Sequence, residues 1–394
     1  MGAVSVMMRD FEFSLKTRFI FGKHADARAG AELAAKGLTA VTICHNGSRF
    51  LYDGGLLDGV KNALDAAGVR WGEFMCGTEP NPRLSRVYQC IEAVRAAGSR
   101  GLLAIGGGAV IDHTKAVAAG VPYDGDVWDF FTGRAAIRAA LPVAALLTNP
   151  ASGSESSGVM VINNAETSEK RLASSPFIQP ELALMNPDIT RSLPASVTAN
   201  GLVDMFSHIA ERYFTNDAEF GIIDHMAEGA MAAVASFGPK LLENLDSYEL
   251  RAQAMWTAAI AHNDTLGVGR AQDWATHIIA NELSALYDTP HGVSLSVIMP
   301  AWMQYVYKND EARFARYGRR VFGLEGAGAA RECIAATKGF FRCLGMPVSF
   351  AQAGIPTDSL GKLADMTQMP ENGLIGASTP LTRADVAQIL ELAR

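Results

Sequence analysis

The chain has 394 residues and a mass of 41.9 kDa, and at about 150 residues per domain this length predicts two or three domains. Hydrophobic residues make up 49% of the sequence and charged residues 19%, a composition that excludes an intrinsically disordered chain. The formal net charge of -7 leaves no basic surplus to neutralise phosphates, so nucleic acid is excluded as an expected partner.

The N-terminal residues 1–13 have neither the basic start nor the apolar run of a signal peptide. No stretch of the chain approaches the roughly 18 unbroken apolar residues that a membrane-spanning helix needs. The five cysteines are scattered, with no C-x-x-C pair, and indicate neither a disulfide framework nor a thiolate metal site. We therefore expect a cytoplasmic protein with no membrane partner.

Between residues 18 and 186, short apolar runs alternate with helical patterns, as in βαβ units around a mostly parallel sheet. The expected strands are residues 19–21, 40–45, 72–76, 101–105, 141–147 and 159–163. Residues 55–67 and 83–97 carry apolar side chains at spacings of three and four, which predicts crossover helices.

After Asn186 the apolar spacing becomes helical nearly throughout, and strand-like runs disappear. Pro187 and Pro194 lie where this change occurs, and proline commonly interrupts helices and strands, so we place a domain boundary near residue 190. The predicted fold is an α/β domain with a Rossmann-like, mostly parallel sheet over residues 1–190, followed by an all-α domain over residues 191–394.

Two turns rich in glycine and hydroxyl groups follow buried-type strands of the first half. Gly106, Gly107 and Gly108 follow the strand at residues 101–105 and open a helix, and residues 148–155 follow the next such strand. Glycines let the backbone approach a phosphate, and the free N–H groups at a helix start point at it. Phosphate binding is therefore expected; the alternative is two ordinary surface turns, because Gly-Gly-Gly is not the full G-x-G-x-x-G fingerprint.

Residues 200–215 are predicted to form a helix whose apolar side chains share one face. Asp204, His208 and Glu211 lie on the other face at positions i, i+4 and i+7, a spacing that can bind a metal ion but is also typical of a solvated face. His277 lies on a second predicted helix, and His291 follows a proline suited to opening a third. The two imidazoles could complete a set of one Asp and three His, if the fold brings them together.

Together these segments resemble the iron-containing (group III) alcohol dehydrogenase family, most of all its butanol dehydrogenase and NADPH-dependent aldehyde reductase branch. The resemblance extends from about Phe13 to the C-terminus. The motifs that carry it are Gly106-Gly107-Gly108 with Asp112 and Lys115, Pro150-Ala151-Ser152-Gly153-Ser154-Glu155, Ala199-Asn200-Gly201-Leu202-Val203-Asp204 with His208, Gln272-Asp273-Trp274-Ala275-Thr276-His277, and Pro290-His291-Gly292.

The resemblance implies a dinucleotide-binding first domain and a metal-binding helical domain that together transfer hydride between a nicotinamide and a small or medium primary alcohol or aldehyde. The metal ligands that it implies are Asp204, His208, His277 and His291. Nitrogen and oxygen ligands suit Fe2+ and Zn2+ alike, and such an ion would polarise the substrate oxygen. Glu211 is not a ligand in the family, so we expect it at the surface or behind the ligands. Homodimers or larger homo-oligomers are usual in the family.

The resemblance also implies where the cofactor binds. The diphosphate is expected against the glycines at 106–108, and Lys170 near the phosphates or the nicotinamide ribose. The other cofactor-binding positions that it implies are Asp112, Thr148, Asn149 and Ser152.

Nucleotide preference is predicted from the turn after the strand that ends at His45. NAD-using relatives tend to place an Asp there, where it binds the adenine ribose and repels a 2'-phosphate. This chain reads Asn46-Gly47-Ser48-Arg49, with no acid before Asp53. Ser48 or Arg49 could donate to a 2'-phosphate, so the chain is predicted to prefer NADP(H) over NAD(H).

One departure from the family concerns proton transfer. Many relatives have a further His four residues after the third ligand, but this chain has Asn281. An amide can hydrogen-bond a substrate, yet it cannot shuttle a proton at neutral pH. We expect Asn281 beside the substrate, with Tyr287 and water as the candidate proton donors.

Other function classes stay open. A lyase resembling dehydroquinate synthase would use the same plan, NAD and a metal, but would regenerate the cofactor in each cycle; the closer match of residues 273–277 to the aldehyde reductase branch argues against it. A metal-dependent hydrolase would need no nucleotide, and the glycine turns argue against that class. A non-catalytic binding protein is the remaining alternative.

Overall fold

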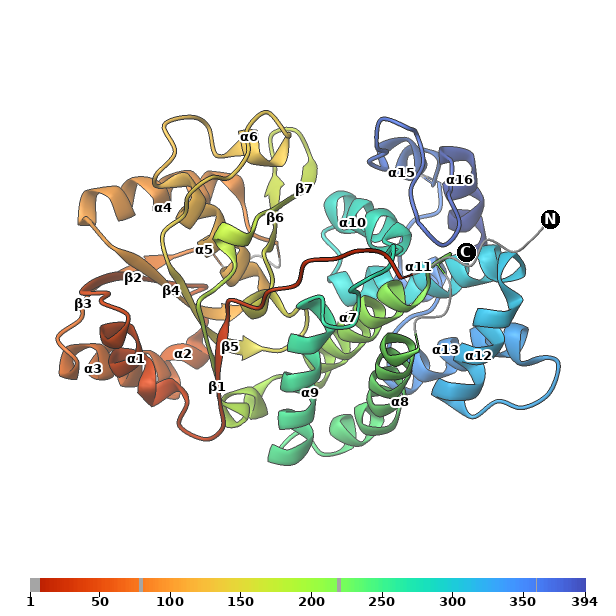
Figure 1. The fold of residues 1–394 in the computed structure, drawn as a ribbon, viewed down its shortest axis with the longest axis horizontal. Helices are drawn as coiled ribbons and strands as arrows, with labels where there is room; N and C mark the ends of the chain where they lie inside the picture. The colour runs from red at the N-terminus through yellow and green to blue at the C-terminus, as the bar shows by residue number, and fades with distance from the viewer. Residues whose placement is uncertain (1–7, 78–80, 218–220, 359) are drawn as a thin grey trace. The chain divides into compact units, whose positions relative to one another are not determined.

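The computed structural model describes residues 8–77, 81–217, 221–358 and 360–394 (Figure 1). Residues 1–7, part of the segment in which the sequence shows no signal peptide, lie outside the described residues. The chain divides into two compact units. The α/β unit consists of Ser14–Leu193 and Asp246–Ala259, and the helical unit contains Pro194–Leu245, Ile260–Arg394 and the described residues before Ser14.

A six-stranded sheet forms the centre of the α/β unit (Figure 1). Its strands are β1 (Arg18–Phe21), β2 (Ala40–His45), β3 (Arg70–Met75), β4 (Gly101–Gly107), β5 (Val143–Asn149) and β8 (Leu182–Met185). They lie in the order β1-β8-β5-β4-β2-β3, and every neighbouring pair is parallel. This confirms the predicted α/β fold class with a mostly parallel sheet.

Helices cover both faces of this sheet. One face packs against α1 (Ala29–Ala35) and α3 (Leu56–Ala66), and the other against α4 (Leu84–Ala97) and α5 (Gly108–Gly120). In β4, Leu103 and Ile105 lie in the core with α1 and α3, whereas Leu102 and Ala104 lie in the core with α4 and α5. Burial on both faces explains why the strand reads as an unbroken apolar run.

Two further short helices of the described residues complete the connections of the α/β unit, together with segments of 3-10 helix. The short helices include α2 (Arg49–Asp53), after β2, and α6 (Trp128–Phe131), between α5 and β5. The 3-10 segments are Asp26–Arg28, Ser154–Ser156, Pro176–Ile178 and Pro187–Ser192. The first of them precedes α1, which has only seven residues.

The segment predicted as a strand at residues 159–163 forms β6 (Val159–Asn164), but it does not join the sheet. It pairs antiparallel with β7 (Glu169–Ser174) in a separate hairpin. Strand β7 is absent from the expected strands, because its six residues Glu-Lys-Arg-Leu-Ala-Ser lack an apolar run. The strand β8 (Leu182–Met185) is likewise absent from the expected strands.

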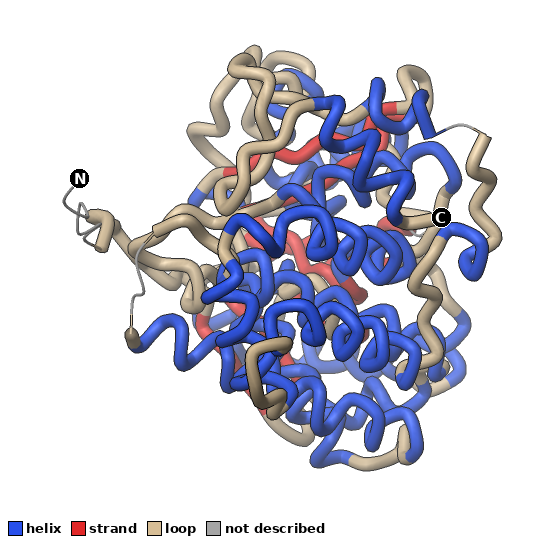
Figure 2. Tube along the Cα trace, turned by 90° about the vertical axis from the view of Figure 1, so that its right-hand side faces the viewer, coloured by secondary structure: helices blue, strands red, loops and turns tan. Residues whose placement is uncertain are grey.

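The helical unit consists of helices and loops, seen in blue and tan in Figure 2. Its helices are α7 (Ala195–Tyr213), α8 (Ile222–Glu243), α10 (Ala275–Tyr287), α11 (His291–Val306), α12 (Glu311–Phe322), α13 (Ala329–Cys343), α14 (Phe350–Ala353), α15 (Leu360–Met366) and α16 (Arg383–Leu392), with 3-10 segment Tyr307–Asn309. Among the described residues after Pro194, the β pairing consists of one isolated bridge between Ile375 and Leu381. The predicted all-α second half is confirmed.

Helix α9 (Tyr248–His262) lies within the predicted second domain, residues 191–394. In the structure, its residues up to Ala259 belong to the α/β unit instead. Trp256 packs edge-on against Phe19, with ring centroids 5.3 Å apart, and the Lys23 ammonium lies 5.0 Å from the Tyr248 ring centre. The assignment of cofactor binding to residues 1–190 and metal binding to residues 191–394 stays a prediction.

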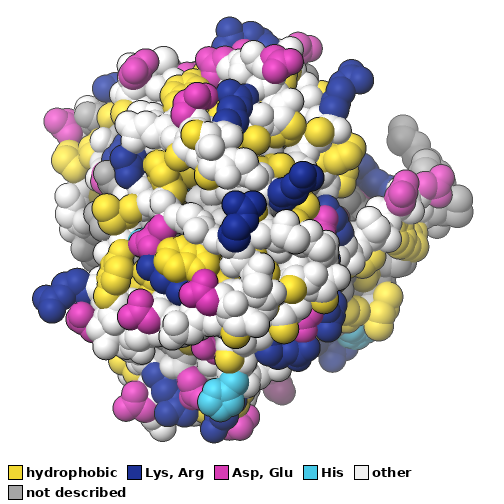
Figure 3. Space-filling view, turned by 90° about the vertical axis from the view of Figure 1, so that its left-hand side faces the viewer, with side chains coloured by type: hydrophobic (Ala, Val, Ile, Leu, Met, Phe, Trp, Pro, Cys, Tyr) yellow, Lys and Arg dark blue, Asp and Glu magenta, His cyan; other side chains and the backbone are white. Residues whose placement is uncertain are grey.

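None of the helices within the described ranges combines the length and the apolar character needed to cross a membrane. On the face drawn in Figure 3, basic and acidic side chains are interspersed rather than gathered by sign. That pattern agrees with the small net charge of the chain.

Candidate functional site

Helix α7 carries the first group of predicted ligands in the interior of the helical unit. Asp204 is 5% exposed, His208 3% and Glu211 0%. The alternative of a solvated helix face is therefore wrong, and α7 is instead buried nearly all round from Leu202 to Tyr213. Three polar side chains on a buried face need partners, because an unpaired buried polar group is costly.

Three side chains from three helices converge at this point. Asp204 lies on α7, His277 on the first turn of α10, and His291 is the first residue of α11, directly after Pro290. Their ligand atoms all lie within 4.8 Å of one another. The Asp204 Oδ1 atom is 3.8 Å from His277 Nε2 and 3.9 Å from His291 Nε2.

The donor set at this point fits a divalent cation. Asp204 Oδ1 and His277 Nε2 are buried, and neither has a hydrogen-bond partner among the described residues. A carboxylate oxygen and imidazole nitrogens are ligands that both Zn2+ and Fe2+ accept. An ion bound between them would supply the interaction that these buried atoms lack.

His208, the fourth predicted ligand, does not belong to the set within 4.8 Å. Its Nδ1 atom hydrogen-bonds the backbone carbonyl of Asp204 at 3.0 Å and lies 3.2 Å from Asp204 Oδ1. Its ring centroid is 4.3 Å from that of His277 and also 4.3 Å from that of His262. The fold thus places His208 beside the other ligands, and brings in His262, which sequence spacing did not single out.

The site is electrostatically prepared for positive charge. Burial opposes ionisation of Asp204, but the facing imidazoles, His208 foremost, outweigh it and hold the pKa of this carboxyl well below its usual value. Burial likewise opposes protonation of His277, yet the charges of Glu211 and Asp204 raise its pKa to about 9. Positive charge is therefore favoured at the centre of the cluster.

Of the two positions that the sequence left open for Glu211, the surface and the region behind the ligands, the structure shows the second. It is fully buried, and its carboxylate hydrogen-bonds the His277 imidazole at Nδ1. The available sequence signal was its place seven residues after Asp204, on the same face of α7. Burial could not be read from that spacing, because charged helix faces are usually solvated.

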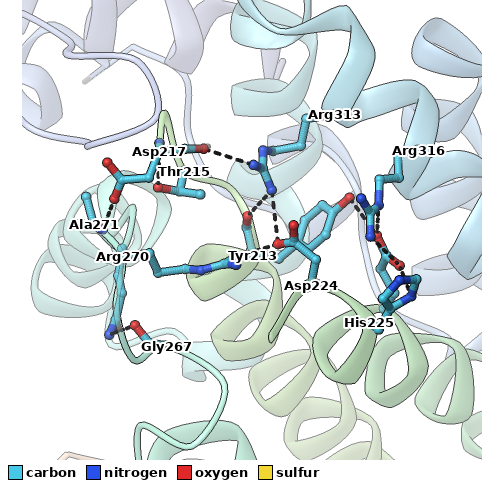
Figure 4. Close-up of polar contacts among 12 residues, drawn as sticks. Tyr213, Thr215, Asp217, Asp224, His225, Gly267, Arg270, Ala271, Arg313 and Arg316 are labelled. Atoms are coloured by element: carbon cyan, nitrogen blue, oxygen red, sulfur yellow. Dashed lines mark hydrogen bonds and ion pairs between the residues drawn. The ribbon is translucent and has the colours of Figure 1, made fainter. Parts of the chain in front are cut away.

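An ionic cluster inside the helical unit holds the loop that leads into α10 (Figure 4). Asp224 lies 2.6 Å from Arg270 and 3.3 Å from Arg313, and these three side chains are nearly closed to solvent. Arg313 also donates to the backbone carbonyls of Tyr213 and Asp217. The Asp217 carboxylate in turn accepts the Ala271 amide, so the loop is fixed to the end of α7.

The motif at residues 272–277 contributes further fixing contacts. The Asp273 carboxylate accepts the backbone amides of Ala275, Ala377 and Ser378 at 2.8 to 2.9 Å. Burial, with the nearby charge of Glu211, raises the pKa of Asp273 to about 6. The Trp274 ring lies 4.6 Å from the Arg212 guanidinium. These contacts hold the first turn of α10, on which His277 stands.

Two residues considered for substrate contact and proton transfer lie further along α10. Asn281 is half-buried and one turn beyond His277, so the two side chains share a helix face. Tyr287 is the last residue of the helix, and its hydroxyl is buried with no hydrogen-bond partner among the described residues. A hydroxyl without a partner is free to donate to a bound molecule.

The glycine turns lie at one edge of the parallel sheet. Strands β2, β4 and β5 are neighbours, so the segments that follow their carboxyl ends lie side by side. These segments are residues 46–49, the start of α5 at Gly108, and the turn after Asn149. The N-cap residue of α5, Gly107, provides no side-chain cap, which leaves its first amides available to an anion.

Steric limits explain the glycines of this edge. A Cβ atom at Gly106 would lie 2.5 Å from Val110, and one at Gly107 would lie 3.0 Å from the Asn149 Cβ. At Gly108 it would overlap the Ser152 hydroxyl. The Asn149 Oδ1 atom is buried and has no hydrogen-bond partner among the described residues, which fits a polar ligand at this edge. Thr148, before it, is partly exposed.

Asp112 makes its hydrogen bonds within the protein. Its carboxylate accepts the Ser154 hydroxyl at 2.5 Å and the Val161 amide at 3.0 Å. The buried Lys115 ammonium donates to Ser154 at 2.7 Å and to the Val159 carbonyl at 2.8 Å. Burial raises the pKa of Asp112, against the charges of Lys115 and Lys170, so Lys170 on β7 lies near the same carboxyl. These residues order the second glycine turn.

The turn after β2 has the geometry of a short hydrogen-bonded loop. Asn46 Oδ1 accepts the Ser48 amide at 3.1 Å, and Gly47 has a φ of 74°, a value that favours glycine. The Arg49 side chain is 92% exposed, and it lies 3.5 Å from Asp53. No acidic side chain occurs at positions 46–49.

A parallel α/β unit with a glycine-rich edge, together with an Asp and His cluster in a helical unit, agrees with the resemblance to the iron-containing alcohol dehydrogenases. Family models agree: the one described as iron-containing alcohol dehydrogenase matches residues 16–187, and the one for the C-terminal part of the Fe-containing alcohol dehydrogenase family matches residues 198–394. The chain belongs to this family, and it is an oxidoreductase of alcohol and aldehyde groups.

Individual relatives span nearly the whole chain. NADH-dependent butanol dehydrogenase B of Clostridium acetobutylicum is 35% identical over 390 residues, which cover 98% of this chain and 99% of that protein. NADPH-dependent aldehyde reductase YqhD of Escherichia coli is 35% identical over 395 residues, covering 98% and 100%. The crystal structure of NADH-dependent butanol dehydrogenase A from Thermotoga maritima superposes with a TM-score of 0.94 at 37% identity, covering 98% and 99%.

Proposed function

We propose that the chain is a metal-dependent alcohol dehydrogenase or aldehyde reductase that prefers NADP(H) and acts on small or medium primary alcohols and aldehydes. The observation that carries this proposal is the convergence of Asp204, His277 and His291, whose ligand atoms lie within 4.8 Å of one another. His208, with its Nδ1 atom 3.2 Å from Asp204, is the fourth proposed ligand. The names of the relatives support the substrate class.

The roles of the side chains follow from their positions. Asp204 and the three histidines would hold one divalent ion, Fe2+ or Zn2+. When bound, the ion supplies Lewis-acid polarisation of the substrate oxygen, and the nicotinamide supplies or accepts the hydride. Burial of Asp204 and His208 excludes water from the ligands and strengthens their interactions with charge. Asn281 would hydrogen-bond the substrate.

Proton transfer is proposed for a group other than Asn281. Its amide neither gains nor loses a proton readily at neutral pH, so it cannot act as the general acid or base. Tyr287, whose buried hydroxyl has no partner among the described residues, is one candidate donor, and a water molecule held by Asn281 is the other.

Nucleotide binding is proposed at the edge formed by β2, β4 and β5. Gly106, Gly107 and Gly108 would accept the diphosphate, because the α5 amides carry no side-chain cap there. Thr148, Asn149, Ser152 and Lys170 would line the rest of the nucleotide, and Asp112 would support the turn that bears Ser152. We propose 2'-phosphate contacts from Ser48 and Arg49 beside Gly47, since no acid lies at positions 46–49 to repel it.

The remaining aspects of the proposal rest on the family and on composition. Homodimers or larger homo-oligomers and a cytoplasmic location are proposed. The names of the relatives divide between NADH and NADPH, so the proposed preference for NADP(H) depends on the turn after β2. The division of labour between residues 1–190 and 191–394 is part of the same proposal.

A spectrophotometric assay tests the function. The purified chain is loaded with Zn2+ or Fe2+, and the absorbance of NADPH or NADH is followed with butyraldehyde, before and after chelation. The proposal expects metal-dependent oxidation of the reduced cofactor, faster with NADPH. No oxidation by metal-loaded protein across several aldehydes would favour the lyase alternative, in which the cofactor is regenerated. Metal-dependent activity without any nucleotide would favour a hydrolase.

A further inference from the structure

The Glu211 carboxylate is the meeting point of four hydrogen-bond donors from two consecutive residues. Its Oε1 atom accepts the Thr276 amide at 2.8 Å, the His277 amide at 3.2 Å, and the Thr276 hydroxyl. Its Oε2 atom hydrogen-bonds His277 Nδ1. All these groups are buried, so the contacts are shielded from competition by water.

One helix therefore faces both nitrogens of the same imidazole. Glu211 contacts Nδ1 of His277, and Asp204, seven residues earlier on α7, lies 3.8 Å from Nε2. A carboxylate can only accept, so Nδ1 must carry a proton toward Glu211. The lone pair of a neutral imidazole is then at Nε2, the atom that faces Asp204 and has no hydrogen-bond partner among the described residues.

We propose that Glu211 is a positioning residue that fixes the ring orientation and the tautomer of His277 so that Nε2 is presented to the metal ion. The inference rests on the proposed function, since it presupposes that the cluster binds a metal. The two backbone amides and the Thr276 hydroxyl hold the carboxylate itself in place. A metal ion that enters the site then binds His277 without any reorientation of the ring, and this strengthens its binding.

Replacement of Glu211 by Gln separates this role from simple packing, because Gln has the same shape. The amide nitrogen is a donor and cannot satisfy the other donors. At the Oε1 position the amide nitrogen would face three other donors, which are the Thr276 amide, the Thr276 hydroxyl and the His277 amide. The orientation of lower energy therefore places it at the Oε2 position. There it donates to Nδ1 of His277, and the imidazole proton moves to Nε2, where it blocks metal binding.

Zinc affinity is the first readout, measured by competition with a chelator for the wild type and for Glu211→Gln. We expect roughly 10-fold to 100-fold weaker Zn2+ binding by the variant. Glu228→Gln is the matched control, since Glu228 is also a buried carboxylate of the helical unit but contacts Arg316 and Tyr213. The control is expected to lose stability and to keep its Zn2+ affinity.

The second readout is a histidine-selective 1H–15N NMR spectrum of the zinc-loaded wild type, with the His277 signals assigned through their absence in His277→Asn. We expect a proton on Nδ1 and none on Nε2. This measurement stands even if Glu211→Gln does not fold. A proton on Nε2, or Zn2+ affinity of Glu211→Gln equal to that of Glu228→Gln, would overturn the inference. A wild-type chain that binds neither Zn2+ nor Fe2+ would instead overturn the proposed function.

Discussion

The carboxylate of Asp224 lies 2.6 Å from the guanidinium of Arg270, an ion pair drawn in Figure 4. Both side chains are almost completely closed to solvent. Arg270 stands three residues before Asp273, in the loop that leads into α10. Burial opposes ionisation of Asp224, but the hydrogen bond and charge of Arg270 outweigh it, and the pKa of this carboxyl is lowered. The pair therefore links α8 to the segment that carries His277.

Asp224→Asn is expected to destabilise the chain strongly, by about 3 to 5 kcal/mol, because Arg270 and Arg313 would keep their charge in the interior without the carboxylate. Urea unfolding of the two proteins measures the difference. Glu391→Gln, which removes an exposed pair with Arg394, is the control and is expected to cost less than about 1 kcal/mol. Equal losses in the two variants would contradict the assigned role of Asp224.

Glu155 predicts a distinct dependence of stability on pH. Burial raises the pKa of its carboxyl to about 7 from 4.5, and neither carboxylate oxygen has a hydrogen-bond partner among the described residues. The folded chain then binds a proton that the unfolded chain releases between pH 4.5 and 7. Its stability should fall as pH rises through this window, by about 3 kcal/mol in all.

Glu155→Gln tests this sign, because the amide does not titrate. Urea unfolding between pH 4.5 and pH 7.5 is expected to show that the fall is absent in the variant and present in the wild type. Glu92→Gln, at an exposed side chain of α4, should leave the wild-type dependence unchanged. If Glu155→Gln retained the full slope, the titrating group would have to be another residue.

Gly292 sets the distance between α11 and α7 next to His291. A Cβ atom at this position would lie 2.5 Å from the backbone oxygen of Asn200, so one helix must shift. Gly292→Ala is expected to cost about 1 to 3 kcal/mol of stability. The shift would displace His291 from the other ligands, so we expect Zn2+ to bind roughly 10-fold more weakly. This corresponds to a loss of about 1.4 kcal/mol of binding free energy. Chelator competition and urea unfolding measure the two changes.

The matched control for that substitution is Gly339→Ala on α13, where no atom lies within 4 Å of the added methyl group. Alanine is the better helix former, so this variant should gain up to about 1 kcal/mol and bind Zn2+ like the wild type. Unchanged Zn2+ binding in Gly292→Ala would show that His291 does not depend on the close approach.

Much of the fold could be predicted because its burial pattern is local. Residues 101–105 form a strand buried on both faces, and that environment selects an unbroken apolar run. Residues 83–97 carry their apolar side chains at helical spacing because α4 buries one face. Helix α9 shows the limit: Trp256 groups it with the α/β unit through Phe19, and a contact this far apart in sequence has no local signature.

The candidate site divides in the same way. Asp204 and His208 share a helix face by spacing alone, but whether that face is buried depends on α10 and α11. The resemblance to a family placed His277 and His291 with them, and the fold brings both within reach of Asp204. The sequence could not decide between the two positions of Glu211, because its partner is a backbone turn 65 residues away.

The nucleotide preference gives the last prediction, at Asn46. Its Oδ1 atom accepts the Ser48 amide, and Asp can make the same hydrogen bond, so Asn46→Asp preserves the turn while adding a negative charge. A 2'-phosphate beside it would be repelled, so kcat/KM with NADPH should fall by about 10-fold or more, which corresponds to a repulsion of about 1.4 kcal/mol. The value of kcat/KM with NADH should change less. Asn164→Asp makes the same change in the β6–β7 turn, where Asn164 accepts the Glu166 amide, and should leave both values unaltered. A parallel loss with both cofactors would mean that position 46 does not face the 2' position of the ribose.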